Sequence, residues 1–322
     1  MQAYVYHRYG GPEVVELVDV PTPVPRDNEV LVRIHATTVS TGDWRVRTLE
    51  VPKGFGLFAR LALGFTRPRQ PILGTELAGT VETVGKSVTR FKPGDAVFAF
   101  PGTKMGCHAQ YRAIAEESPI ELKPENLSFE EAATLSFGGS TALHFLGRAQ
   151  IKRGERILVI GASGALGTAF VQLAKHFGAH VTGVTSTTNL QLVSSLGADK
   201  VIDYTKDDFT RMSETYDIIA DTVAATSFAR CKHVLKHNGR FLALAGGVAD
   251  LFAALWAPMT GKRVVAGPAA ERPEYVRQLA ELARTGVIRP VIDRRYEFAQ
   301  MAEAHAYVET GRKRGSVVVR VT

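Results

Sequence analysis

The 322-residue chain contains little cysteine, only Cys107 and Cys231. Two cysteines are too few for the disulfide framework of a secreted domain or for a four-cysteine zinc site. The chain also lacks a run of 18 or more apolar residues, and it does not begin with a basic segment followed by an apolar one. The sequence therefore predicts neither a membrane span nor a secretory signal, and we expect a cytoplasmic protein.

Acidic residues are the minority charge, with 32 Asp and Glu against 39 Lys and Arg, which leaves a net charge of +7. Such an excess favours nucleic acid, an acidic membrane surface or a phosphate-rich cofactor as partner. The basic residues are scattered and form no cluster interleaved with aromatic residues, which favours the cofactor and argues against nucleic acid. The length corresponds to about two domains, because single cores stop growing near 250–300 residues.

Glycines gather in one informative place. Arg156–Ile160 reads as a buried strand, the turn Gly161–Gly167 follows, and apolar residues then recur at helical spacing until a second strand, His180–Val184. A pyrophosphate approaches the backbone only where no side chain intervenes, and the start of a helix supplies free N–H groups and a positive dipole end. The unit predicts a dinucleotide site. A tight turn without a ligand and a methyltransferase that binds another nucleoside are the alternatives.

Two patterns of secondary structure divide the chain. The first third has short strands punctuated by Pro and Gly, which is typical of a small, partly open barrel; we expect strands at 1–5, 14–20, 29–36, 77–85 and 95–100. Ser128–Glu131 is a capping box that opens a helix. Helices then alternate with strands of a doubly wound parallel sheet, expected at 157–160, 181–184, 201–202, 217–220, 241–245 and 263–266. The last part predicts helices near 272–285 and 299–310 and a strand at Ser316–Val321.

Four segments carry a family resemblance: Gly74–Val81, Phe91–Val97, Gly161–Gly167 and Leu196–Tyr204. Together they resemble the medium-chain dehydrogenase/reductase superfamily, in its branch of zinc-independent quinone oxidoreductases and 2-alkenal reductases. The resemblance implies an α/β protein with a GroES-like, partly open β-barrel catalytic domain from residues 1–124 and 267–322. It further implies a Rossmann doubly wound parallel sheet at 125–266, an active site at the junction of the domains, and a homodimer built through the Rossmann sheets.

Metal chemistry is decided by three positions. In zinc-dependent relatives the ligands fall where this chain has Ser40, Thr75 and Phe137. Catalytic zinc needs three protein ligands, typically thiolate or imidazole, and two hydroxyls and a phenyl ring do not supply them. The sequence predicts no metal site, and we expect the neighbouring Glu76 to make structural hydrogen bonds. Without a Lewis acid, an electron-poor acceptor such as a quinone or a conjugated enone is the favoured substrate.

The choice of cofactor depends on the end of the second Rossmann strand. An NAD site usually has Asp or Glu about 20 residues after the glycines, whereas an NADP site omits it. The corresponding stretch is Thr185–Asn189, and no acidic residue occurs between Glu155 and Asp199. NADP(H) is therefore predicted, with a hydrophilic turn indifferent to the phosphate as the alternative. The resemblance adds Tyr204 as a contact of the 2′-phosphate and Lys175 and Lys206 as candidate charge partners. The predicted cofactor-binding residues are Thr141, Ser163, Gly164, Ala165, Leu166, Gly167, Ser186, Thr187, Asn189, Tyr204, Ala245 and Gly246.

The predicted catalytic residues are Ser40, Asp43 and Arg45. Val39–Arg45 resembles the family segment that lies under the nicotinamide, in which a lysine at the position of Arg45 contacts the ribose or the substrate oxygen. As a cation, Arg45 would stabilise developing enolate or quinol charge, and a salt bridge from Asp43 would orient it. An ordinary structural turn is the alternative. His108 and Tyr111 are candidate proton donors, against a solvent-facing histidine and a core tyrosine.

Two apolar stretches have open roles. Phe55–Phe65, flanked by Lys53, Arg67 and Arg69, suits the mouth of a substrate site or contact with a membrane that carries a lipid quinone, but a short helix over the barrel is favoured. Leu251–Trp256 suits packing or a substrate wall, and it precedes the strand Arg263–Ala266, which relatives use at the dimer seam.

The sequence thus predicts an NADPH-dependent, zinc-independent reductase of quinones or α,β-unsaturated carbonyls. Two other functions stay open. One is a zinc-independent alcohol or ketone oxidoreductase. The other is a non-enzymatic protein that binds NADPH or RNA, in the manner of the lens crystallins related to quinone oxidoreductases.

Overall fold

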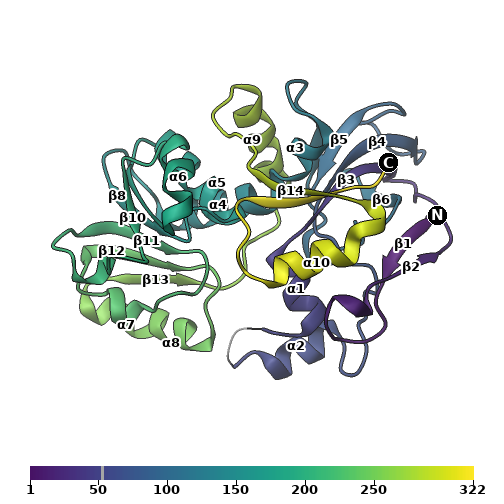
Figure 1. The fold of residues 1–322 in the computed structure, drawn as a ribbon. Helices are drawn as coiled ribbons and strands as arrows, with labels where there is room; N and C mark the ends of the chain where they lie inside the picture. The colour runs from purple at the N-terminus through teal and green to yellow at the C-terminus, as the bar shows by residue number, and fades with distance from the viewer. Residues whose placement is uncertain (52–53) are drawn as a thin grey trace. The chain divides into compact units, whose positions relative to one another are not determined.

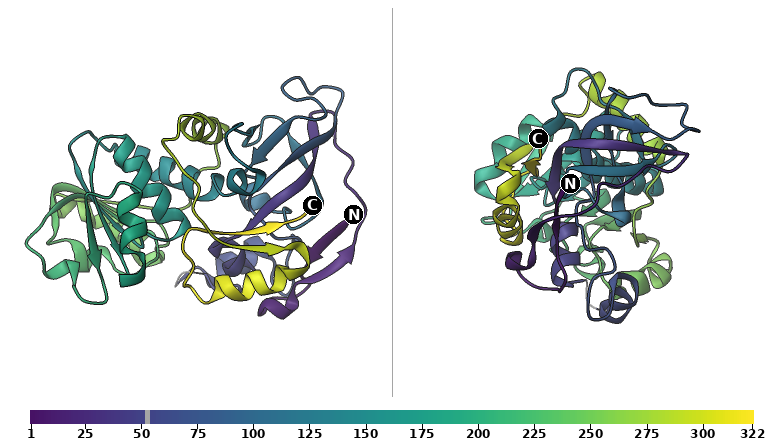
Figure 2. Two further views of the ribbon diagram at one scale, coloured as in Figure 1. Left: turned by 45° about the horizontal axis from the view of Figure 1, so that its top comes forward. Right: turned by 90° about the vertical axis from the view of Figure 1, so that its right-hand side faces the viewer.

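The computed structural model describes residues 1–51 and 54–322, so Lys53 lies outside the described residues. The chain divides into two compact units (Figure 1). Unit 1 contains residues 1–51, 56–140 and 271–322, and unit 2 consists chiefly of residues 141–270. Both ends of the chain belong to unit 1 (Figure 2).

Unit 1 is built on a seven-stranded sheet in the order β14-β15-β3-β4-β5-β7, with β6 also paired to β3; a separate hairpin pairs β1 with β2. The strands are β1 (Gln2–Val5), β2 (Glu16–Asp19), β3 (Glu29–Val39), β4 (Leu77–Val84), β5 (Ala96–Ala99), β6 (Tyr111–Ala115), β7 (Ile120–Leu122), β14 (Ile292–Glu297) and β15 (Ser316–Arg320). Strand β3 lies at the centre because Val30, Val32 and Ile34 alternate onto one buried face. The expected barrel strands are all present.

The α-helices described within unit 1 are α1 (Thr41–Thr48), α2 (Gly56–Leu63), α3 (Phe129–Ala133), α9 (Pro273–Arg284) and α10 (Met301–Glu309). The capping box at Ser128 is confirmed, because its hydroxyl accepts the Glu131 N–H and the Glu131 side chain accepts the Ser128 N–H. Helix α2 also forms, but the expectation that its apolar side chains pack over the barrel is wrong. Leu57, Phe58 and Leu61 are more than half exposed.

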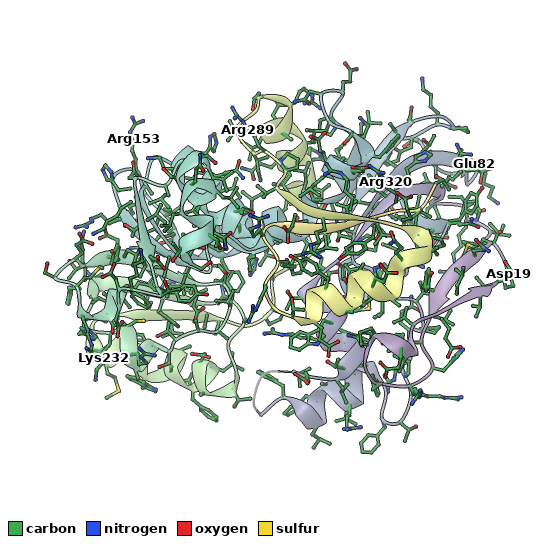
Figure 3. The ribbon with its side chains drawn as sticks, in the orientation of Figure 1. Asp19, Glu82, Arg153, Lys232, Arg289 and Arg320 are labelled. Atoms are coloured by element: carbon green, nitrogen blue, oxygen red, sulfur yellow. The ribbon has the colours of Figure 1, made fainter. Side chains whose placement is uncertain are left out.

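The unit boundaries differ from the domain boundaries expected at 124/125 and 266/267, and fall at 140/141 and 270/271. Helix α3 opens the helical part of the sequence, yet it packs on β3 and β4 of unit 1. Its Glu130 accepts hydrogen bonds from Arg295 on β14 and from Arg320 on β15, the latter labelled in Figure 3. The change of secondary structure at Ser128 therefore precedes the change of unit, which occurs inside α4 (Ser136–Ala149).

Unit 2 is a doubly wound parallel sheet in the order β10-β9-β8-β11-β12-β13. All five of its pairings are parallel, as predicted. The strands are β8 (Arg156–Ile160), β9 (His180–Thr185), β10 (Lys200–Asp203), β11 (Tyr216–Asp221), β12 (Leu235–Ala243) and β13 (Arg263–Ala266), and the helices between them are α5 (Ala165–His176), α6 (Leu190–Ser195), α7 (Phe228–Cys231) and α8 (Val248–Trp256). Helices α5 and α6 cover one face of the sheet and α7 and α8 the other (Figure 1).

Candidate active site

The turn between β8 and α5 has the geometry of a phosphate loop. Gly161 has a φ of +77°, which L side chains rarely adopt. A Cβ at Gly167 would lie 2.1 Å from the Gly161 carbonyl oxygen, whereas a Cβ at Gly164 would meet nothing nearer than 3.6 Å. Gly167 therefore closes the turn, and Gly164 caps the helix beside partly exposed Ser163, Ala165 and Leu166. The first N–H groups of a helix have no partner within it, so this end can receive an anion.

A polar turn after β9 is joined to this loop. The Thr185 hydroxyl donates to the Ser163 hydroxyl at 2.8 Å. The Asn189 amide donates to Ser163 and to Ser186, each at 3.2 Å. Three of the residues predicted to bind the cofactor, Ser163, Ser186 and Asn189, thus form one hydrogen-bonded group.

An acidic residue that the sequence did not predict to lie here enters this turn from β10. Asp203 lies opposite Thr185 in the parallel register, and the Thr187 hydroxyl donates to its carboxylate at 2.5 Å. Hydrogen bonds from Thr187 and then Thr205 lower the pKa of Asp203. The hydroxyl of Thr187 is therefore committed to Asp203. The clue was the length of the strand, because β10 continues through Asp203 instead of ending at 202.

Of the three candidate contacts of a 2′-phosphate, Lys175 and Lys206 each lie near an aspartate, whereas the Tyr204 side chain is exposed. Tyr204 follows Asp203 and its side chain is exposed. Lys175 pairs with Asp199, with its Nζ 2.7 Å from a carboxylate oxygen. Lys206 lies 4.0 Å from an oxygen of Asp203. Because Lys175 already has a counter-ion, Tyr204 is the candidate most open to a new ligand.

The remaining predicted cofactor contacts lie on α4 and after β12. Thr141 is half-buried on α4. Ala245 and Gly246 follow the end of β12, and Gly247 caps α8 with its N–H donating to Asp250 at 3.0 Å. In a parallel sheet the carboxyl ends of the strands meet at one edge, so this loop lies at the same edge as Gly161 and Thr185.

In unit 1, Ser40 and Asp43 form the start of α1. The Ser40 hydroxyl and N–H both donate to Oδ2 of Asp43, at 2.6 and 2.8 Å, and the Gly74 N–H donates to Oδ1 at 2.8 Å. The Asp43 N–H donates back to the Ser40 hydroxyl, which completes a capping box. Asp43 is fully buried and clamps the Gly74 loop to α1. The expected salt bridge from Asp43 to Arg45 is therefore wrong, because the carboxylate is used by the backbone and by Ser40.

Arg45 is half-buried on α1. Among the described residues its guanidinium makes no hydrogen bond or ion pair. Burial lowers its pKa. Removing a cation from water without a partner is costly, so this group is suited to receive an anion or a developing negative charge.

The positions that correspond to zinc ligands meet beside this clamp. A Cβ at Gly42 would lie 3.3 Å from the Ser40 hydroxyl and 3.8 Å from the Phe137 ring. Thr75, next to Gly74, is buried, and its hydroxyl has no hydrogen-bond partner in the described part of the chain. Buried hydroxyls are nearly always hydrogen-bonded, so an unpaired one is a candidate donor to a ligand.

Glu76 has the structural role that we expected. Its carboxylate accepts the Thr38 hydroxyl at 2.6 Å and the Phe137 N–H at 2.7 Å. Burial raises its pKa to about 7, although both hydrogen bonds lower it. Glu76 thereby fixes Phe137 relative to the Thr75 backbone.

His108 does not face solvent. It is fully buried and donates from Nε2 to the Thr38 carbonyl at 3.0 Å, and its ring lies edge-on to His305 at 5.3 Å. Burial lowers the pKa of both histidines. His108 and His305 are therefore neutral parts of the core. The other candidate proton donor, Tyr111, is half-buried on β6.

Known proteins match the chain along its whole length. Residues 26–126 match the family model "Alcohol dehydrogenase GroES-like domain", and residues 196–319 match the model "Zinc-binding dehydrogenase". The chain is 34% identical to the 2-methylene-furan-3-one reductase of Solanum lycopersicum, over 99% of this chain and 79% of that protein. It is 30% identical to the quinone oxidoreductase of Homo sapiens, over 97% and 94%. The solved structure of the Coxiella burnetii quinone oxidoreductase superposes with a TM-score of 0.89 at 28% identity, covering 100% and 99% of the two chains.

The chain belongs to the medium-chain dehydrogenase/reductase superfamily. Its homologues named as quinone oxidoreductases and alkenal/one oxidoreductases place it in the branch that the sequence resembles. The second family model takes its name from zinc-binding members of this superfamily. In this chain, no group of three or more His, Cys, Asp or Glu side chains among residues 1–51 and 54–322 is arranged to hold a metal ion.

Proposed function

We propose that the protein is an NADPH-dependent, zinc-independent oxidoreductase that transfers hydride to quinones or α,β-unsaturated carbonyls. The observation that carries the proposal is the set of side chains at the positions where zinc-dependent relatives have their metal ligands. Ser40, Thr75 and Phe137 supply two hydroxyls and a ring in place of metal ligands, in a chain that is a full-length relative of enone and quinone reductases. A conjugated acceptor needs less carbonyl activation than a simple ketone, so hydrogen bonding and charge suffice.

The residues present fit an NADP(H) cofactor. The open N-terminus of α5 and the small residues Gly164 and Ala165 suit the pyrophosphate. Ser186 and Tyr204 suit the 2′-phosphate as hydroxyl donors, and the Asn189 amide holds Ser186 in place. A relative at 32% identity is named as an NADPH-dependent alkenal/one oxidoreductase. When bound, the cofactor supplies a hydride from C4 of its nicotinamide. The two carboxylate oxygens of Asp203 accept hydrogen bonds from Thr187 and Thr205, so they are engaged within this turn, while the carboxylate keeps its negative charge.

On the acceptor side, the chain's own contribution is position and charge. Arg45 holds the oxygen on which negative charge develops, and the Thr75 hydroxyl is a second donor. Ser40 and Asp43 act as positioning residues, because their side chains fix the start of α1 and the Gly74 loop. Holding donor and acceptor in contact can lower the barrier by about 7–11 kcal/mol.

A substrate panel with NADPH tests the proposal. We expect 1,4-naphthoquinone and 2-alkenals to be reduced much faster than simple ketones, in protein that contains no stoichiometric zinc by metal analysis. If simple ketones react equally fast, the alternative of an alcohol or ketone oxidoreductase is favoured. If no acceptor oxidises NADPH while RNA binds tightly, the protein has a non-enzymatic role. One zinc per chain with activity lost on chelation would refute the zinc-independent mechanism.

We also propose a cytoplasmic homodimer joined through β13. This strand is the last in the unit 2 sheet and, in the part of the chain that the structure describes, pairs on one side only, with β12. An unpaired edge is a ready template for a second chain. Light scattering should give a mass near twice the 35.0 kDa of the chain. The monomer mass would contradict the dimer without affecting the proposed reaction.

A further inference from the structure

Helix α2 presents its large apolar side chains to solvent. Leu57, Phe58 and Leu61 are 62%, 66% and 55% exposed, and Phe65, just after the helix, is 60% exposed. At helical spacing the first three form one stripe, while Ala59 and Leu63 on the other side are partly buried. Single exposed apolar residues are ordinary, but four large ones on one short segment mark a candidate interaction site.

This helix is held in place by specific contacts. The Tyr9 hydroxyl donates to the Gly64 carbonyl at 2.8 Å, and the Arg69 N–H donates to the Leu63 carbonyl at 2.8 Å. An eight-residue helix is marginal alone, so these contacts matter for its stability. The apolar stripe is therefore a fixed outer face of unit 1.

Basic residues lie on the helix and in the segment that follows it. No acidic residue occurs between Glu50 and Glu76. Arg60, Arg67 and Arg69 are exposed, and none has an acidic partner among the described residues. Burial raises the pKa of Tyr9, while nearby Arg60 and Arg69 lower it, so these two cations converge at the end of the helix. We call the four apolar and three basic side chains the α2 surface.

Helix α8 offers a useful contrast. Phe252, Leu255 and Met259 are 63%, 77% and 89% exposed, so this face is as apolar as the α2 surface. It carries an acidic residue, Asp250, and no arginine within the helix, although Lys262 and Arg263 follow Met259 in the sequence. Of these two helices, only α2 combines an apolar stripe with an arginine, Arg60, that has no acidic partner among the described residues.

We propose that the α2 surface docks the protein onto an anionic lipid bilayer. The four apolar side chains enter the boundary between headgroups and acyl chains, and the three arginines meet lipid phosphates. No helix within residues 1–51 and 54–322 is long and apolar enough to cross a membrane, so this contact is peripheral. Docking would bring the enzyme to the phase in which apolar quinones and enones collect, but it does not rest on the proposed reaction.

Sedimentation of the full-length protein with lipid vesicles tests the proposal, without cofactor or acceptor. We expect binding to vesicles of phosphatidylcholine with phosphatidylglycerol, and weak binding to phosphatidylcholine alone. Each of Arg60→Gln, Arg67→Gln and Arg69→Gln should lower the partition coefficient about fivefold at low salt. The triple change Leu57→Ser, Phe58→Ser, Leu61→Ser should lower it about tenfold or more, and this loss should persist in high salt.

The matched control is the pair Phe252→Ser and Leu255→Ser on α8, which should leave vesicle binding unchanged. Thermal melting of each variant checks that the fold is intact. The proposal is overturned if the wild-type protein stays in the supernatant, or if the α8 pair loses as much binding as the α2 triple. It is also overturned if the α2 changes alter only the mass in solution, or only the KM for an acceptor measured without vesicles. Because the binding assay contains no substrate, its failure and that of the proposed reaction are distinguishable.

Discussion

Arg45 carries a half-buried charge without a counter-ion, and this makes it the most informative single position in unit 1. We predict that Arg45→Ala lowers turnover with an enone or quinone about a hundredfold, the size of effect seen when one donor to a developing oxyanion is lost. The Kd for NADPH should change little. Arg45→Lys should recover part of the turnover because it keeps the charge. Stopped-flow turnover and fluorescence titration separate the two quantities, and an equal loss in both would make Arg45 a cofactor ligand instead.

Glu76 gives a prediction about pH and stability. Its folded pKa, about 7, lies above the unfolded value of 4.5, so the folded state binds a proton that the unfolded state releases. The free energy of unfolding should therefore fall as pH rises from 4.5 to 7, by about 3 kcal/mol from this group. In Glu76→Gln the amide can still accept the Phe137 N–H and can donate to Thr38. Urea unfolding should show that the free energy of unfolding of the variant rises relative to that of the wild type from pH 5 to 8. If the two free energies change with pH in parallel, the raised pKa of Glu76 is contradicted.

Tyr204 tests the preference between cofactors. We predict that NADPH binds more tightly than NADH and that Tyr204→Phe narrows the difference about fivefold, because one neutral hydrogen bond contributes about 1 kcal/mol. The exposed side chain makes a change in folding improbable as the cause. Titration of both cofactors by nicotinamide fluorescence measures the ratio. Equal affinities in the wild-type protein would remove the argument from the acid-free turn.

The role of a single residue was predictable where it depends on the backbone conformation of consecutive residues. It was unpredictable where it depends on a partner that is distant in the sequence. The glycine turn was visible because strand, turn and helix are consecutive in the sequence. Asp43 was misassigned because its partner, the Gly74 N–H, lies 31 positions away. The contact between Thr187 and Asp203 depends on the register of two strands, and the sequence does not state that register.

At the scale of elements, the phosphate turn provides a matched pair of variants. Gly167→Ala should destabilise the fold, because its Cβ would lie 2.1 Å from a backbone oxygen that cannot move freely. Gly164→Ala should fold normally, since its φ of −77° suits alanine and its Cβ has space. It should nevertheless bind NADPH less tightly, because the methyl group occupies the approach of the pyrophosphate. Calorimetry measures the Tm of each variant and titration measures its Kd for NADPH. If Gly167→Ala and Gly164→Ala change Tm and Kd to the same extent, the different surroundings of the two glycines are contradicted.

Elements with strong periodicity or a recognised capping box were predicted, and helix α1 was not. The capping box at Ser128 was recognised by its Glu at the third position. The equivalent box at Ser40 was missed because Asp43 was interpreted as a catalytic group, and α1 went unpredicted. For α2, packing over the barrel was favoured over an outward apolar face, because an apolar stretch alone does not say on which side its partner lies.

At the scale of the whole molecule, unit 2 is nearly continuous in sequence and unit 1 is not. We predict that a fragment of residues 136–270 folds cooperatively and binds NADPH, because within residues 1–51 and 54–322 its six strands pair only with one another. Circular dichroism during urea unfolding and cofactor titration provide the test. A fragment that stays disordered with the cofactor present would show that unit 2 depends on the rest of the chain.

The division into domains was predictable in kind but not in position. The return of the chain to the first domain followed from the resemblance, yet the boundaries moved by 16 and 4 residues, since 140 replaces 124 and 270 replaces 266. The shift has a physical cause, which is the attachment of α3 through Glu130 to two strands from the far end of the chain.

The pairing of β15 with β3 has a consequence for the order of events during synthesis. Val319 on β15 lies opposite Thr37 on β3. Strand β3, at the middle of the barrel sheet, therefore cannot complete its pairing until the ribosome has synthesised β15, the last strand of the chain. Until then, the apolar side chains of β3 and its hairpin partners lack part of their cover, while the nucleotide-binding domain is already complete and free to fold. The catalytic domain is therefore the late and vulnerable half of the nascent protein. A premature stop codon that removes only residues 316–322 would leave a chain with a formed cofactor domain and an open barrel, which is a target for chaperones and proteases.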